Sequence, residues 1–156
     1  MQVNRVNSQP NFKGKTFLMV KPHAVKENKT AGILSYVSEN TKGLKITRAK
    51  LIQLTRPQAE AHYEEHRGKG HFEKIVNALL EGPVLMLEVK GRKVIQKTQA
   101  IKKDLRAKFG DPENATYNAL HMADSKKSSK RERTLHLPSE PNMFQKFLTK
   151  LNPIKK

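Results

Sequence analysis

One histidine in this sequence stands where it could carry out chemistry. His121 ends a short apolar run, and Asp124 and Ser125, which follow soon after it, are typical of the residues that cap the start of a helix. An imidazole titrates near neutral pH and can act as a nucleophile, so a histidine held in such a turn could carry a proton or a phosphoryl group. Because a lone histidine beside a turn is commonly structural, its function depends on partners supplied by the rest of the chain.

The composition limits the classes of protein to which this chain could belong. The 156 residues suit one compact domain, and no apolar run reaches the length of a membrane-spanning helix. The N-terminus lacks the apolar segment of a secretory signal, and the absence of cysteine excludes disulfides and thiolate metal sites. These features predict a cytoplasmic protein that does not insert into membranes.

The net charge of +17 is the most extreme feature of the composition. Eight lysines and arginines gather within residues 90–108, and a second basic group follows within residues 126–133. So basic a surface attracts polyanions such as nucleotides, nucleic acid or acidic membranes. The alternative is a solvated face that only keeps the protein soluble. No tryptophan is present and the phenylalanines follow core-like patterns, so a platform for stacking nucleic-acid bases is not indicated.

Apolar periodicity and chain breakers predict the elements that would position His121. Residues 16–20 form a largely apolar run rich in strand formers, which predicts a buried central strand stopped by Pro22. Further strands are predicted over 44–54, 84–89 and 117–122, and helices over 31–40, 55–66, 71–80, 93–109 and 125–133. The order favours an α/β (α+β) fold of the ferredoxin-like type, a four-stranded antiparallel sheet with covering helices on one face.

The chain divides simply along its length. We expect residues 1–14 to be an N-terminal extension, 15–138 to be the folded domain and 139–156 to be a basic C-terminal tail. No internal repeat is present, and neither is a glycine-rich phosphate-binding loop. A phosphate site in this chain would therefore be built from side chains.

Five short motifs in this sequence resemble those of the nucleoside diphosphate kinase family. In chain order they are Met19-Val20-Lys21-Pro22-His23-Ala24-Val25, His62-Tyr63, Gly82-Pro83-Val84, the segment 118–125 around His121, and Glu132. They follow one another at spacings close to those of the family, over roughly residues 15–138. The resemblance implies an enzyme that moves the γ-phosphate of ATP to nucleoside diphosphates through a phosphohistidine, in two half-reactions.

The resemblance also implies a role for each matching residue. His121 would be the nucleophile, and Glu132 would hold the imidazole in one tautomer through a hydrogen bond to Nδ1. Lys21 would contact the phosphates, and Tyr63 would donate its hydroxyl near the transferred group. The nucleotide would be held by Asn118 at the sugar or a phosphate, by His71 against the base and by Arg106 at the phosphates, with Lys102 or Lys108 as substitutes for a further family arginine. Mg²⁺ would be bound together with the nucleotide.

Some of these residues also have structural interpretations. Lys21 could be a surface lysine at the end of a strand, Tyr63 a packing residue and Arg106 part of a solvated basic face. The four remaining histidines lack carboxylate partners at the spacing of metal ligands, so no role is predicted for His23, His62, His66 or His136.

The sequence departs from the family at four places, one of which is His71, where the family has an aromatic residue that stacks on the base. His23-Ala24 replaces Asp-Gly, and Met122-Ala123 replaces Gly-Ser, which removes a hydroxyl that supports the glutamate in the family. The stretch between Gly91 and Asn118 is shorter than in the family, where it carries phosphate-binding arginines and packs subunits together. The shortening therefore removes part of the segment through which subunits of the family contact one another, although the resemblance implies a homo-oligomer.

Two functions follow from these observations. The first is a divergent nucleoside diphosphate kinase that acts through His121. The alternative is a catalytically weak module of the same fold that binds nucleic acid or another polyanion through its basic surface.

Overall fold

The computed structural model describes residues 14–138, so the predicted C-terminal tail and almost all of the predicted N-terminal extension lie outside the described residues. The strands are β1 (Lys15–Val20), β2 (Lys45–Ile52), β3 (Val84–Lys90) and β4 (Leu120–Met122). The helices are α1 (Pro22–Lys26), α2 (Thr30–Asn40), α3 (Arg56–His62), α4 (Phe72–Leu80), α5 (Val94–Phe109) and α6 (Lys126–His136), with short 3-10 helices η1 (Glu64–His66) and η2 (Ala115–Tyr117).

The four strands form one antiparallel sheet in the order β2-β3-β1-β4, which confirms the predicted sheet. The central strand β1 is apolar on both sides, because Phe17 and Met19 face one way and Leu18 and Val20 face the other. Both faces of the sheet must therefore be covered.

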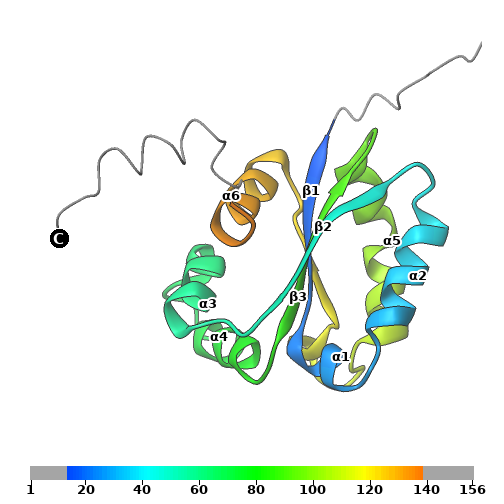
Figure 1. The fold of residues 1–156 in the computed structure, drawn as a ribbon. Coiled ribbons are helices and arrows are strands. Elements are labelled where there is room, and N and C mark those ends of the chain that lie inside the picture. The colour runs from blue at the N-terminus through cyan, green and yellow to red at the C-terminus, as the bar shows by residue number, and fades with distance from the viewer. Residues whose placement is uncertain (1–13, 139–156) are drawn as a thin grey trace, which may run out of the picture.

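Helices lie on both sides of the sheet, so the predicted one-sided arrangement is wrong (Figure 1). On one side, α2 and α5 contribute Ile33, Val37, Ile101 and Leu105 to a core with the Leu18 side of β1. On the other side, α3 and α4 pack Ala59, Val76 and Leu79 against the Phe17 side. The sequence pattern predicted these helices but could not assign them to a face.

Two local predictions also need correction near the ends of strands. Pro22 was expected only to stop the first strand, but it opens α1, because proline is tolerated in the first turn of a helix. The strand predicted over 117–122 is reduced to β4, since η2 and a turn occupy the residues before Leu120. Each of these segments lies next to the cleft described below.

None of the helices within residues 14–138 combines the length and the apolar character needed to cross a lipid bilayer.

Candidate active site

A cleft of about 440 Å³ lies where β1, α3, α4, α5 and β4 meet. Six of the residues implied by the resemblance line it, namely Lys21, Tyr63, His71, Arg106, Asn118 and His121. The seventh, Glu132, lies behind His121 with only 1% of its surface exposed. Segments more than 100 residues apart in the chain, such as those of Lys21 and Glu132, thus converge on one site.

The hydrogen bond between His121 and Glu132 defines the chemistry of the imidazole. His121 Nε2 lies 2.9 Å from Glu132 Oε2, so the predicted bond to Nδ1 is wrong and the other ring nitrogen makes it. An ionised carboxylate only accepts hydrogen bonds, so Nε2 carries the proton and Nδ1 keeps its lone pair. Within residues 14–138, Nδ1 has no hydrogen-bond partner, and it is not among the buried polar atoms that lack one. The free nitrogen is therefore accessible for reaction.

The position of Glu132 depends on how α6 begins. The Ser125 hydroxyl caps the helix by accepting a hydrogen bond from the Ser128 amide at 3.1 Å, and the Ser128 hydroxyl accepts one from the Ser125 amide at 3.0 Å. Asp124 accepts a further bond from the Ser128 hydroxyl at 2.8 Å. The helix start predicted from Asp124 and Ser125 is confirmed, and it fixes the register that brings Glu132 behind His121.

A neighbouring arginine takes part in holding the glutamate. Arg131 Nη2 lies 3.6 Å from Glu132 Oε1, and Arg131 Nη1 donates to the Ala61 carbonyl at 3.1 Å at the end of α3. Ala123, which replaces the family serine, is buried and packs in the core beside α3 and α4. The carboxylate therefore has a cationic neighbour, a contact that the sequence analysis missed although Arg131 directly precedes Glu132.

A strained turn carries the chain into β4 just before His121. Ala119 adopts a φ of 65°, in the left-handed region that non-glycine residues rarely occupy. Its carbonyl accepts a bond from the Lys21 amide at 2.9 Å, and its amide donates to His23 Nε2 at 3.1 Å. Burial lowers the pKa of His23, which keeps this ring neutral and able to accept. His23, for which no role was predicted, thus supports the turn that positions the nucleophile.

Lys21 places a cation at the base of the cleft. Its side chain is nearly buried, and Nζ donates to the Thr116 carbonyl in η2 at 3.0 Å. Burial, and to a smaller extent the nearby Arg106 guanidinium, lowers the pKa of Lys21 to about 8. The ammonium group is therefore less solvated than a surface lysine, which strengthens its attraction for a phosphate. The alternative of a solvated surface lysine is wrong.

Arg106 and Asn118 carry unused polar atoms into the same region. Arg106 Nη2 donates to the Leu120 carbonyl at 3.2 Å, whereas its Nε is buried without a partner within residues 14–138. Asn118 Nδ2 donates to the Ala115 carbonyl at 3.1 Å, and its Oδ1 is likewise buried and unpaired there. Buried polar groups are usually satisfied, so these two atoms indicate room for a polar ligand.

Close packing at Gly110 brings Asn118 against the end of α5. A Cβ atom at Gly110 would lie 2.5 Å from the Arg106 carbonyl oxygen and 3.1 Å from the Asn118 Cα. Only glycine allows this approach, which keeps Arg106 and Asn118 on the same wall of the cleft.

Tyr63 and His71 lie at the side of the cleft formed by α3 and α4. Tyr63 follows α3 directly and is 8% exposed, and burial raises the pKa of its hydroxyl, which therefore stays protonated and able to donate. His71 is exposed at the start of α4, where its Nε2 lies 3.0 Å from His66 Nδ1. This pair of rings offers the surface against which a base was predicted to stack.

The two lysines predicted as substitutes for a family arginine have different positions. Lys102 lines the cleft one helical turn before Arg106. Lys108 instead lies over the Tyr36 ring, 5.3 Å from its centroid, on the α2 side of the molecule. Only Lys102 is therefore placed to add charge to the cleft.

Two further histidines, for which no role was predicted, pack behind His121. The His62 ring meets the His121 ring edge-on with centroids 4.5 Å apart, and His62 Nδ1 lies 3.1 Å from His136 Nε2. Both rings are nearly fully buried, and burial followed by the neighbouring His121 lowers the pKa of His62 well below its usual range and that of His136 to about 4. His136 follows Glu132 by four residues, which places both side chains on one face of α6. This spacing was the feature of the sequence from which a position of His136 near His121 could have been predicted.

This buried pair predicts how stability depends on pH. In the unfolded chain these histidines take up protons near pH 6.5, whereas in the folded protein they stay neutral to a lower pH. The unfolded state therefore binds more protons below pH 6.5, and the free energy of unfolding falls as the pH falls. For His136 alone, with a folded pKa of about 4, the free energy of unfolding should fall by about 2 kcal/mol between pH 6.5 and 5. Urea unfolding of the wild type and of His136→Gln at both pH values measures this loss as the difference between the two proteins, because His62 contributes to both. The same loss in His136→Gln, which cannot titrate there, would contradict the assignment.

Comparisons with known proteins agree with this geometry. A family model described as nucleoside diphosphate kinase matches residues 14–141. The nucleoside diphosphate kinase of Pyrococcus furiosus is 35% identical over 137 residues, which cover 81% of this chain and 84% of that protein. The enzyme of that name from Bdellovibrio bacteriovorus is 38% identical over 130 residues, covering 77% of this chain and 89% of its own.

A solved structure supports the same conclusion for the fold and the family. The crystal structure of the Aquifex aeolicus nucleoside diphosphate kinase superposes with a TM-score of 0.68 at 25% identity, covering 78% of this chain and 92% of that one. The predicted family, fold and enzyme class are confirmed. The chain belongs to the nucleoside diphosphate kinase family and is, like these relatives, a nucleoside-diphosphate phosphotransferase.

Proposed function

We propose that this chain moves the γ-phosphate of ATP to nucleoside diphosphates by way of a phosphate on Nδ1 of His121. The observation that carries the proposal is the 2.9 Å hydrogen bond that His121 Nε2 donates to Glu132, which leaves Nδ1 as the nitrogen with a free lone pair beside the cations of the cleft. In the first half-reaction the lone pair of Nδ1 forms a bond to the γ-phosphorus, and the bond from that phosphorus to the bridging oxygen breaks, so ADP leaves. In the second, a terminal oxygen of the acceptor diphosphate forms a bond to the same phosphorus, and the bond from that phosphorus to Nδ1 breaks, which regenerates the imidazole.

Glu132 would stabilise the phosphorylated ring in this scheme. The ring keeps its proton on Nε2 while Nδ1 becomes bonded to phosphorus, so positive charge develops on the imidazole. The buried carboxylate at Nε2 offsets this charge, in the way that a carboxylate stabilises an imidazolium in hydrolytic triads. The role proposed for Glu132 is therefore electrostatic as well as orienting.

The cations of the cleft would neutralise the charge on the transferred group. Lys21 and Arg106 approach it from the β1 and α5 sides, and Lys102 adds a third cation. Phosphoryl transfer depends mainly on positioning and charge stabilisation, which these groups supply without forming bonds. Tyr63, protonated at neutral pH, would donate a hydrogen bond at the same place.

The residues of the cleft fit Mg²⁺ only as an ion carried by the nucleotide. Within residues 14–138 no group of three histidine or carboxylate side chains could hold a metal, and Glu65 and Asp124 are the acidic residues that line the cleft. Mg²⁺ commonly binds substrate phosphates together with one or two carboxylates and water, so Asp124 or Glu65 would serve as its protein contact. When bound, the ion would neutralise negative charge on the phosphates.

A labelling experiment tests the proposal. The full chain is incubated with [γ-³²P]ATP and Mg²⁺, freed of nucleotide and then mixed with GDP. We expect acid-labile, base-stable label on the protein that passes to GTP on addition of GDP. Label that does not pass to GDP would instead indicate autophosphorylation, and an absence of label would favour the weak binding module.

Replacement of Glu132 tests its electrostatic role. In Glu132→Gln the amide oxygen can still accept from Nε2–H, but the negative charge that offsets the phosphorylated ring is lost. We expect kcat to fall by about 10- to 100-fold with KM little changed, because the missing interaction develops only as the phosphoryl group arrives. The matched control is Glu39→Gln on the exposed face of α2, which should retain wild-type kinetics. A rise in KM at constant kcat would point to nucleotide binding instead.

The assembled cleft supports the kinase over the catalytically weak module. A cytoplasmic location and a homo-oligomeric state stay predictions from the composition and the resemblance.

A further inference from the structure

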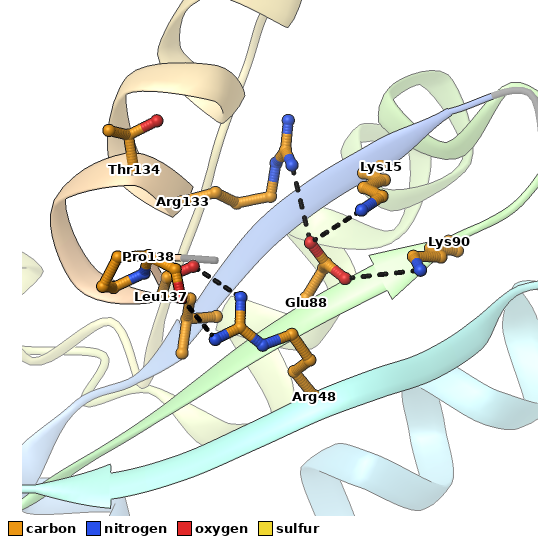
Figure 2. Close-up of a pocket in the computed structure, with 8 residues that line it drawn as sticks. All are labelled: Lys15, Arg48, Glu88, Lys90, Arg133, Thr134, Leu137 and Pro138. Carbon is orange, nitrogen blue, oxygen red and sulfur yellow. Dashed lines mark hydrogen bonds and ion pairs between the residues drawn. The ribbon is translucent and has the colours of Figure 1, made fainter. Parts of the chain in front are cut away.

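Two hollows outside the catalytic cleft adjoin one another along α6. One, of about 830 Å³, lies between the start of α5 and the start of α6, and the other, of about 460 Å³, lies between α6 and the sheet (Figure 2). Both are lined by Lys15 and Arg133, and Asp124 lines the first hollow as well as the catalytic cleft. Because the two hollows share lining residues, they are here called together the basic groove, whose lining extends from Asp124 at the rim of the cleft to Pro138.

The basic groove is strongly positive. Besides Lys15 and Arg133, its basic lining residues are Arg48, Lys90, Arg92, Lys93, Lys126 and Lys130, which come from both edges of the groove. Its acidic lining residues are Glu88 and Asp124. Such an excess of like charge is unfavourable in isolation and favours an anion with several charges.

The acidic residues do not cancel this charge. Glu88, 3% exposed at the floor of the groove, is shared by Lys15 at 3.5 Å, Arg133 at 3.5 Å and Lys90 at 3.7 Å (Figure 2). One carboxylate thus serves three cations, and Arg133 Nε is buried without a partner within residues 14–138. Glu88 therefore holds the cations in place and leaves most of their charge for a ligand.

The start of α5 adds to the positive potential. Its first turn contains no acidic residue, and no side chain caps it. Its first residues, Val94, Ile95 and Gln96, line the same hollow as Arg92 and Lys93, so the positive end of the helix dipole lies beside these two side chains. Backbone and side-chain charges thus act in the same direction here.

We propose that the basic groove binds the phosphodiester backbone of nucleic acid. No aromatic residue lines either hollow, so bases have no stacking platform and binding would not depend on sequence. The exposed large hydrophobic residues of the described chain, Ile46, Leu51 and Leu135, also lie outside both hollows. Of the apolar residues that line the hollows, Val94 and Leu137 are buried and Ile95 is half-buried. A concave basic surface with so few exposed apolar side chains suits a charged chain better than a membrane.

A charge-neutralising variant tests the groove without disturbing Glu88. The variant replaces by Gln four exposed basic residues of the groove that form no ion pair with Glu88, namely Arg92, Lys93, Lys126 and Lys130. The matched control replaces Lys42, Lys50, Lys74 and Lys103, which are equally exposed and lie outside the groove. Both variants lose the same total charge.

Binding is measured by fluorescence anisotropy with a single-stranded RNA of about 20 nucleotides and mixed sequence, between about 50 and 200 mM salt. We expect the groove variant to bind the RNA at least about tenfold more weakly than the control variant does. The slope of the logarithm of the binding constant against the logarithm of the salt concentration should also be smaller in magnitude by roughly 3. Equal affinities of the two variants, or binding to phosphatidylserine vesicles but not to RNA, would overturn the proposal.

Two controls separate this site from the kinase cleft. RNA binding should persist with saturating ADP and in His121→Ala, because neither changes the groove. Kinase activity should persist in the groove variant. Loss of RNA binding on addition of ADP would place the RNA in the catalytic cleft and contradict the groove.

Discussion

His121→Ala should lower kinase activity by at least about 10⁴-fold and abolish labelling by [γ-³²P]ATP. The imidazole is the only group of the cleft that combines a free nitrogen lone pair with a carboxylate on its opposite nitrogen, among the residues that the structure describes. Its removal therefore eliminates the covalent intermediate rather than weakening one of several contacts. Steady-state transfer from ATP to GDP measures the loss.

The fold of this variant must be checked, because His121 packs against His62 and Phe17. Equilibrium unfolding and circular dichroism should show a folded protein that still binds nucleotide, since Lys21, Arg106 and Asn118 remain in place. A folded variant that still exchanges phosphate between nucleotides at the wild-type rate would rule out His121 as the carrier.

Lys21→Gln should lower kcat/KM by about 10²- to 10³-fold, the range found when one preorganised charge-stabilising group is removed. The pH profile gives a sharper prediction. Lys21 is cationic below its pKa of about 8 in the free enzyme, so kcat/KM of the wild type should decline as the pH rises through that value. Steady-state kinetics at fixed ionic strength, between neutral and alkaline pH, measure this decline in kcat/KM.

The conservative variant separates charge from packing. Lys21→Arg keeps a positive charge at alkaline pH, so its kcat/KM should be lower throughout, because the geometry differs, but should lack the decline near pH 8. If Lys21→Arg shows the same alkaline decline as the wild type, the titrating group is not Lys21.

Much of the fold could be predicted from local patterns. The apolar run of β1 and the Asp124-Ser125 cap of α6 are determined by residues adjacent in the sequence, and both predictions are confirmed. The face covered by each helix depends instead on contacts between distant segments. The burial of β1 on both sides was readable in the residues 16–20, and it is the physical reason why helices cover both faces.

The site could be predicted in its members but not in its geometry. The resemblance named Lys21, Tyr63 and His121, yet nothing in the sequence tells which imidazole nitrogen faces α6. Two contacts depend on the fold alone, since His23 reaches the Ala119 turn across 96 positions and His62 meets His136 across 74. The substitutions at His23 and Ala123 thus looked like losses in the sequence and are accommodated in the structure.

The position of phosphate on the imidazole tests the central claim most directly. Wild-type protein labelled with [γ-³²P]ATP is hydrolysed in alkali, and the two phosphohistidine isomers are separated by chromatography. Because Glu132 occupies Nε2, the label should be recovered as Nδ1-phosphohistidine. A proteolytic digest of a parallel labelled sample should place the label on the peptide that contains His121. Recovery of the Nε2 isomer, or of phosphate on any other residue, would contradict the account.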